Sequence, residues 1–324
     1  MNSSRKNGLI PQIEKKIAKK LSLLSLHPAL PPDLFIRKKG VKKHRYFSSC
    51  RDHLGKESLF YARLHKNQNA RKKFITEINF LKRIKRGDLK IKNNIPEIIN
   101  WGIEADFEWL QREKIKPNSL ANFSQKNFPK AFEKISARLS AFMFQVARVK
   151  TKGLGFEKFY WRNYFKSSSL DKLVNQGIVS GELSLELRQM VEKELPLLKK
   201  QNIYLSHGDL TLENILFDGD NFWVIDWERA HLNNSAYDIT FLWMHLWKSR
   251  SSRKKLIEAY LKKLKNNQRV IFKKIFPLVA SYLALGGTFL NIDKEKAKDG
   301  KRRKNFCIQV LKRSPQGFIS LIKI

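Results

Sequence analysis

The chain has 324 residues, with 65 lysines and arginines against 29 aspartates and glutamates and a formal net charge of +36. This length predicts two domains or one large bilobal domain, and the apolar residues, 42% of the chain, recur regularly enough to exclude a disordered protein. The two cysteines, Cys50 and Cys307, exclude a disulfide framework and fit a reducing compartment, although a single bridge stays open. The N-terminus lacks the apolar core of a secretory signal, so we expect a cytoplasmic protein.

Residues 11–26 predict an amphipathic helix that begins at Pro11, with aliphatic side chains from Ile13 to Leu24 on one face and lysines opposite. Such a face either packs on its own domain, which we favour, or lies on an anionic membrane surface. The proline-rich residues that follow predict a linker. Residues 1–32 are therefore expected to form a helix and linker ahead of the first domain.

Residues 33–115 predict a small lobe of mixed structure. Two strands that turn near Gly55 are followed by a helix over residues 69–85, whose apolar stripe includes Phe74. Two more strands lie on either side of Ala105. Strands, one helix and further strands in this order predict an α+β lobe.

Residues 116–324 form the predicted second lobe. The helical pattern covers residues 131–149, 181–200 and 237–324. The uncharged run 275–292 contains a proline and two glycines, and we interpret it as a buried helix in preference to a membrane span. Between the helices, the sequence NIYL predicts a strand, and residues 215–226 predict a β-hairpin with an Asp-Gly turn.

The stretch HGDLTLENIL, residues 207–216, precedes the sequence WVIDWE and places Asp209, Asn214 and Asp226 at spacings that suit phosphoryl transfer. The predicted hairpin would bring Asn214 and Asp226 to the same edge. Asp209 would then orient an attacking hydroxyl, while the amide and carboxylate oxygens of the other two suit Mg²⁺. Residues 207–238 hold seven acidic residues and a single basic one, Arg229, in an otherwise basic chain.

The motif H-G-D-x-x-x-x-N followed by I-D-W-E resembles the aminoglycoside phosphotransferase and choline/ethanolamine kinase superfamily, and the match extends to Asn233 and Asp238. The resemblance implies a bilobal protein-kinase-like α+β fold, with a small antiparallel sheet lobe and a larger helical lobe. It also implies an ATP-dependent phosphotransferase that uses Mg²⁺. Protein kinases usually carry lysine where this chain has Thr211, which favours a small-molecule or glycan hydroxyl as the acceptor.

The same resemblance implies roles for the residues of the motif. Asp209 is the expected catalytic residue, Asn214 and Asp226 are the expected metal ligands, Glu228 is an auxiliary ligand, and Asp238 braces the catalytic loop. His207 is expected to support the loop by hydrogen bonding and not to act as a base.

The resemblance places a nucleotide site in the first lobe. Arg63 stands at the strand position where lysine is usual, Lys66 follows three residues on, and Glu77 matches the helix glutamate that pairs with that cation. Residues 111–115 are the expected hinge, which would offer backbone groups to adenine; its cofactor-binding residues are Gln111, Glu113 and Ile115. The arginine and the lack of a Gly-rich loop keep a catalytically weak kinase-like binding protein as the alternative.

The net charge of +36 indicates either an anionic partner or a compositional bias towards lysine. We expect a neutral or anionic acceptor and peripheral contact with an anionic membrane as an open alternative, and nucleic acid is disfavoured though still open. Aromatic residues could stack on a sugar, although helix packing is the favoured interpretation for each; they are Phe159, Tyr160, Trp161, Tyr164, Trp243 and Trp247.

Overall fold

The computed structural model describes residues 3–29, 45–64, 68–86, 91–159, 161, 168–286 and 298–324. The chain divides into two compact units, Met1–Pro117 and Asn118–Ile324. The division falls two residues after the boundary expected from the sequence. Lys66, Tyr160 and Tyr164, which the sequence singled out, lie outside the described residues.

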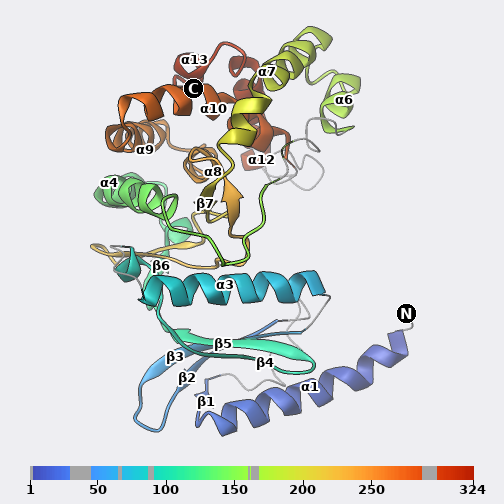
Figure 1. Cartoon of the computed structure of the whole chain (residues 1–324), viewed down its shortest axis with the longest axis vertical. Helices are drawn as coiled ribbons and strands as arrows, with labels where there is room; N and C mark the ends of the chain where they lie inside the picture. Colours follow the sequence, from blue (N-terminus) through green and yellow to red (C-terminus); the bar gives the residue numbers. More distant parts are fainter. Residues whose placement is uncertain are drawn as a thin grey trace. The chain divides into compact units, whose positions relative to one another are not determined.

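The N-terminal unit is built on a five-stranded sheet with the strand order β1-β2-β3-β5-β4 (Figure 1). Its strands are β1 (His27–Pro28), β2 (Arg45–Arg51), β3 (Glu57–Leu64), β4 (Ile98–Ile103) and β5 (Phe107–Glu113). Neighbouring strands run antiparallel, and the turn between β2 and β3 contains Gly55 at φ +76°, as the sequence predicts. The register sets Arg63 of β3 directly opposite Glu108 of β5.

Two helices cover opposite faces of this sheet (Figure 1). Helix α3 (Gln68–Arg86) confirms the predicted stripe, since Phe74, Ile78 and Leu81 are buried. Helix α1 (Ser3–Leu23) buries Ile13, Ile17 and Leu21 against the sheet side chains Phe60, Phe107 and Trp109, among others. The short helix η1 (Lys92–Asn94) leads into β4.

The structure corrects the predicted start of α1 and favours one interpretation of it. The helix begins at Ser3 and not at Pro11, because a proline removes one hydrogen bond without necessarily ending a helix. Lys20 lies 2.7 Å from Glu104 and 5.4 Å from the centre of the Trp109 ring. The apolar face of α1 therefore packs on the sheet of its own unit, which is the interpretation favoured from the sequence.

The C-terminal unit contains two small antiparallel sheets among helices (Figure 1). One sheet pairs β7 (Tyr204–Ser206) with β10 (His231–Asn233), and the other joins β6 (Asn118–Ser119), β8 (Ile215–Phe217) and β9 (Phe222–Val224). The helices are η2 (Leu120–Asn122), α4 (Phe128–Val146), α6 (Ser168–Asn175), α7 (Gly181–Lys200), α8 (Tyr237–His245), α9 (Arg250–Lys263), α10 (Asn266–Leu285), α12 (Lys298–Arg313) and α13 (Phe318–Ile322). This mainly helical unit confirms the expected α+β class with a sheet-rich first lobe.

The core of the C-terminal unit lies around α10, whose residues from Ile275 to Leu285 are all buried. The buried-helix interpretation of this run thus holds for its described part. Among the described residues, no helix combines the length and the apolar character needed to span a membrane. Residues 250–274 carry ten lysines and arginines, and these are not all surface charges, since Arg253 is buried and donates to the backbone oxygens of Leu246, Trp247 and Ile324.

Candidate active site

The predicted catalytic loop, residues 207–214, lies between β7 and β8, and Asp238 in the first turn of α8 holds its backbone. The two carboxylate oxygens of Asp238 accept hydrogen bonds from the backbone N–H groups of His207, at 2.7 Å, and Gly208, at 3.1 Å. Burial raises the pKa of Asp238 to about 6, and the two N–H donors counter part of that effect. The expected bracing role of Asp238 agrees with this geometry.

His207 is a second support of the same loop. Its Nε2 donates to the carbonyl oxygen of Ile225 at 2.9 Å, and its Nδ1 accepts from the backbone N–H of Asp209 at 3.3 Å. A carbonyl can only accept, so the ring carries its proton on Nε2. Burial lowers the pKa of His207 to about 4, and the ring packs on Trp227. A neutral, fully engaged imidazole fits the predicted structural role.

Gly208 brings the loop against the segment that follows β9. Its φ is +80°, which favours glycine, and a Cβ built there would lie 2.2 Å from the carbonyl oxygen of Arg229. It would also lie 2.7 Å from Nδ1 of His231. Only glycine fits this position, so the backbone of Arg229 is in direct contact with the catalytic loop.

Asn214 fixes the backbone of Asp209. Its Nδ2 donates to the carbonyl oxygen of Asp209 at 2.9 Å, and the N–H of Thr211 donates to the same oxygen at 2.8 Å. The Asp209 side chain is 25% exposed. Two hydrogen bonds therefore fix the carbonyl group of Asp209, while its carboxylate stays partly exposed to solvent.

The β8–β9 hairpin joins Asn214 to Asp226 as predicted. Ile215 pairs with Val224, and the carbonyl oxygen of Asn214 accepts from the N–H of Ile225 at 3.0 Å. Asp226 follows directly with φ +65°, a conformation that is uncommon outside glycine and concentrates at functional sites. The amide of Asn214 and the carboxylate of Asp226 therefore leave the same end of the hairpin.

These two residues suit a divalent cation that is shared with phosphates. Because Nδ2 of Asn214 is engaged, its Oδ1 is the amide atom that can face a cation, and it is a hard neutral ligand like the oxygens Mg²⁺ prefers. The described part of the chain contains no group of three or more His, Cys, Asp or Glu arranged to hold a metal. One amide and one carboxylate fit Mg²⁺, which usually completes its shell with water and phosphate oxygens.

Glu228 and Arg229 occupy a tight turn beyond Asp226. The indole N–H of Trp227 donates to Val224 at 3.1 Å, and the N–H of Ala230 closes the turn on the carbonyl of Trp227 at 3.0 Å. Arg229 Nε lies 3.6 Å from Oδ2 of Asp209. Sequence reasoning gave Arg229 no role, although its being the single basic residue of an acidic stretch was a usable signal.

In the N-terminal unit, Arg63 forms a buried ion pair with Glu108 through both Nε and Nη2. Arg63 is 7% exposed and Glu108 is 1% exposed. The guanidinium also lies 5.9 Å from the centre of the Phe74 ring on α3, and Glu77 is buried one turn further along that helix. The expected contact between Arg63 and Glu77 stays a prediction, whereas Glu108 is a partner that the sequence did not reveal.

The expected hinge residues lie at the end of β5. Gln111 is inside the strand, between Phe60 of β3 and Asn100 of β4, and its side chain donates to Ser58 at 3.1 Å. Glu113 is the last strand residue, and Ile115 follows outside the strand. The predicted hinge therefore overlaps the last residues of β5, and only its residues 114–115 lie beyond the strand.

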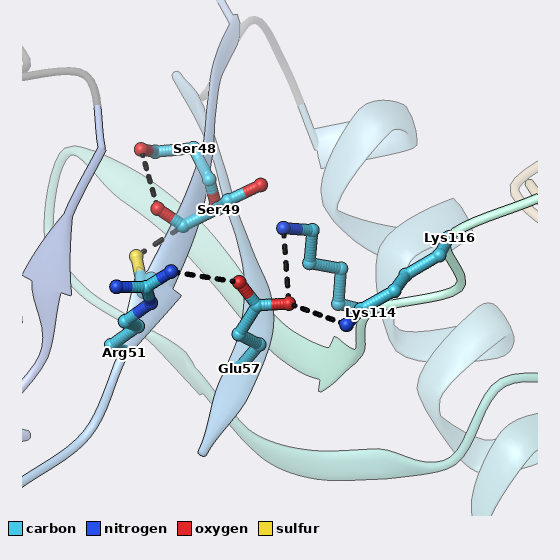
Figure 2. A network of polar contacts seen from close by, with 7 residues as sticks. Ser48, Ser49, Arg51, Glu57, Lys114 and Lys116 are labelled. Atoms are coloured by element: carbon cyan, nitrogen blue, oxygen red, sulfur yellow. Dashed lines mark hydrogen bonds and ion pairs between the residues drawn. The ribbon is translucent and has the colours of Figure 1, made fainter. Parts of the chain in front are cut away.

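Figure 2 shows how the segment after β5 is tied to the start of β3. Glu57 lies 3.3 Å from Lys114, 3.4 Å from Lys116 and 3.4 Å from Arg51. The hydrogen bond from Lys114 is the main cause that lowers the pKa of Glu57, followed by that from Lys116. One carboxylate therefore gathers three cations beside the predicted hinge.

Most of the described aromatic candidates for acceptor binding are packing residues. Trp161 and Trp243 are each almost fully buried. Phe159 contacts the rings of Trp161, Tyr237, Tyr282 and His231, which makes it part of an aromatic cluster beside β10. The favoured packing interpretation holds for this cluster and for Trp243.

The sequence matches the phosphotransferase enzyme family over residues 51–269. This match spans more than half of the chain and includes the catalytic loop and the β8–β9 hairpin, so the chain belongs to that family and is a phosphotransferase. No curated protein matches it.

Solved structures share the fold at low sequence identity. The chain is similar to an amicoumacin kinase in complex with AMP-PNP and Ca²⁺, at 12% identity, 94% and 93% coverage of the two chains and a TM-score of 0.55. It is also similar to the aminoglycoside phosphotransferase APH(4)-Ia, at 15% identity, 93% and 98% coverage and a TM-score of 0.54. Choline kinase LicA from Streptococcus pneumoniae matches at 15% identity, 93% and 99% coverage and a TM-score of 0.54. These likenesses confirm the kinase-like fold.

Proposed function

We propose that this phosphotransferase moves the γ-phosphoryl group of ATP to a hydroxyl of a small molecule or glycan. The observation that carries the proposal is the arrangement of Asp209, Asn214 and Asp226: Asn214 holds the backbone of Asp209 by a hydrogen bond, and the β8–β9 hairpin joins Asn214 to Asp226 at one end. A kinase of this kind works mainly by positioning and electrostatic stabilisation. The rigid support of the loop by Asp238 and His207 suits that task.

Asp209 is the residue that accepts a hydrogen bond from the acceptor hydroxyl and takes its proton as the oxygen attacks the γ-phosphorus, while the bond from that phosphorus to the β–γ bridging oxygen breaks and ADP leaves. Asn214 and Asp226 would hold Mg²⁺, with Glu228 as an auxiliary ligand. The cation, when bound, neutralises charge on the phosphate oxygens. Arg63, supported by Glu77 and Glu108, is the proposed phosphate contact, and the backbone near Gln111, Glu113 and Ile115 is the proposed adenine contact.

The proposed acceptor is neutral or anionic. The matched structures include proteins solved with kanamycin, hygromycin B and spectinomycin, which shows that small hydroxyl compounds occupy this fold. A chain with a net charge of +36 would repel polycationic acceptors of the aminoglycoside type. A cytoplasmic location is part of this proposal, and the burial of the apolar face of α1 gives no support to a membrane-anchored form.

The proposal is tested with γ-labelled ATP, Mg²⁺ and a panel of metabolites and glycans. Asp209→Ala should lower turnover by about 10²- to 10⁴-fold, because general-base and positioning contributions are of that size. Thermal stabilisation by Mg·ATP should persist in the variant. The control is Asp220→Ala, which removes an exposed carboxylate at the opposite end of the β8–β9 hairpin and should leave turnover unchanged.

Two outcomes would count against the proposal in different ways. Full turnover by Asp209→Ala would remove Asp209 from the catalytic role. Stabilisation of the unaltered protein by Mg·ATP without transfer to any acceptor would favour the alternative, a catalytically weak binding protein. The ion pair between Arg63 and Glu108 supports that alternative, because it uses two of the guanidinium nitrogens that would otherwise bind the nucleotide's phosphates.

A further inference from the structure

Arg229 lies at the catalytic carboxylate and is held there by its backbone. The turn from Trp227 to Ala230 contains it, its carbonyl oxygen accepts from Nδ1 of His231 at 2.7 Å, and the same oxygen packs on Gly208. The side chain then passes the Asp209 carboxylate at 3.6 Å. The fold therefore fixes the backbone of Arg229 directly against the loop that carries Asp209.

The guanidinium of Arg229 remains accessible. The side chain is 59% exposed, against 25% for Asp209, and its contact with that carboxylate is longer than a hydrogen bond. A guanidinium has five N–H donors in a planar fork that matches carboxylate and phosphate oxygens. Because more than half of the Arg229 side chain is exposed, a ligand bound at Asp209 can reach these donors.

We propose that the acceptor carries an anionic group, a carboxylate or a phosphate, close to the hydroxyl that is phosphorylated, and that Arg229 binds this group. The inference rests on the proposed function, because it assumes that Asp209 receives the acceptor hydroxyl. A hydroxyl within about 3 Å of Asp209 places the substituents one or two bonds away beside the guanidinium. An anionic substituent gains a forked, charge-assisted contact there, whereas an ammonium group is repelled.

The rest of the C-terminal unit has the same electrostatic bias. Residues 239–324 contain 21 lysines and arginines and four acidic residues. Exposed cations on α9 and α10, such as Lys262 and Lys273, belong to this set. Clustered charge of one sign raises the local concentration of oppositely charged substrates in a salt-dependent way. Long-range attraction and the local contact at Arg229 thus favour the same class of acceptor.

A simpler role for Arg229 would be to offset the negative charge of Asp209. That role predicts an equal loss of activity on every acceptor when the arginine is replaced. Recognition of an anionic group predicts a selective loss, mainly in KM, on anionic acceptors alone. The two roles therefore differ in how the replacement changes the ratio of kcat/KM for anionic acceptors to kcat/KM for neutral ones.

The test compares glucuronate and glucose 1-phosphate with glucose and glucosamine, within a wider panel sorted into anionic, neutral and cationic hydroxyl compounds. Transfer from γ-labelled ATP is measured at low and at physiological salt. The unaltered protein should favour anionic compounds by at least about tenfold in kcat/KM, the size expected of one charge-assisted contact. Arg229→Gln should lower that value about 10- to 100-fold for anionic acceptors and less than about threefold for neutral ones.

Arg188→Gln is the matched control, because the Arg188 side chain is 37% exposed and forms an ion pair with Asp171 at 2.7 Å that joins α7 to α6 and involves no residue of the loop. It should leave the charge preference unchanged, and Arg229→Lys should retain part of it. Equal loss on all acceptors, or no transfer to any anionic compound, overturns the inference. Transfer to neutral or cationic compounds alone overturns it while leaving the proposed function intact, whereas no transfer at all together with no stabilisation by Mg·ATP counts against both.

Discussion

The catalytic loop of the C-terminal unit and the Arg63–Glu108 pair of the N-terminal unit hold their functional side chains in different ways. The loop is held by backbone groups: Asp238 accepts two N–H donors, and Asn214 and Thr211 donate to the carbonyl of Asp209. Arg63 is held by an opposite charge across two strands, in a site where both partners are almost fully buried. One region depends on local hydrogen bonds, and the other depends on charge compensation out of water.

Because the two regions are held differently, they should be sensitive to different kinds of substitution. The hydrogen-bonded loop should not tolerate an added atom at Gly208, because the backbones are in contact there. A buried ion pair tolerates little change in charge, because an ion left without its partner keeps its full desolvation cost. Substitutions in each of the two regions test this difference.

The largest effect on stability is expected from Glu108→Gln. The substitution leaves the buried guanidinium of Arg63 without its countercharge and should lower the free energy of unfolding by about 3–5 kcal/mol. Denaturant unfolding of the variant measures this value. Glu57→Gln is the matched control, since Glu57 pairs with three cations nearer the surface, where solvent screening leaves ion pairs with little effect on stability. If the two variants unfold alike, the burial of the Arg63–Glu108 pair is energetically unimportant.

A smaller but more selective effect is expected from Gly208→Ala. The added Cβ meets the Arg229 carbonyl oxygen and forces the loop to shift, in addition to a cost of about 1–2 kcal/mol for the left-handed backbone. Gly219→Ala is the matched control. Gly219 also has a positive φ, +112°, but a Cβ built there meets no atom, so this variant has the backbone strain without the clash. Turnover should fall at least about tenfold in the first variant and stay unchanged in the second, since a misplacement of about 1 Å can cost that much. Equal turnover in both would show that the close approach at Gly208 does not matter.

The smallest effect is a pH dependence from Asp238. Its pKa is raised from 3.8 to about 6, so the carboxylate is ionised and accepts both loop N–H groups above about pH 6, and turnover should fall as the pH drops through that value. Asp238→Asn should have a lower turnover, and its pH profile should lack the acidic limb, which is the fall in turnover as the pH drops through about 6. Turnover between pH 5 and 8 is the measurement, and an unchanged acidic limb in Asp238→Asn would assign it to another group.

Unfolding free energies would not isolate this group. Between pH 3.8 and about 6 the folded state binds more protons at Asp238 than the unfolded state, so this residue contributes a stability that is lost as the pH rises. His207 works in the opposite direction, because its pKa is lowered from 6.5 to about 4 and its contribution is lost as the pH falls through that range. His207 stays neutral across the proposed assay range above pH 5, so it does not produce the limb in turnover.

Much of the fold and of the catalytic loop follows from the sequence. The stripe of α3, the hairpin from Ile215 to Val224 and the buried part of α10 depend on periodicity and turn residues within one segment. The start of α1 was predicted wrongly at Pro11, because the apolar pattern marks the packed face of a helix and not its first residue.

The sequence by itself determined where Asp209, Asn214 and Asp226 lie along the chain and, through the hairpin between them, that the last two leave the same edge. Only the tertiary structure decided that Glu108 faces Arg63, that the Arg229 backbone packs on Gly208, and that α1 covers the sheet. The physical reason is that the first set depends on short-range spacing. The second depends on strand register and on contacts between segments tens of residues apart, which composition and periodicity do not encode.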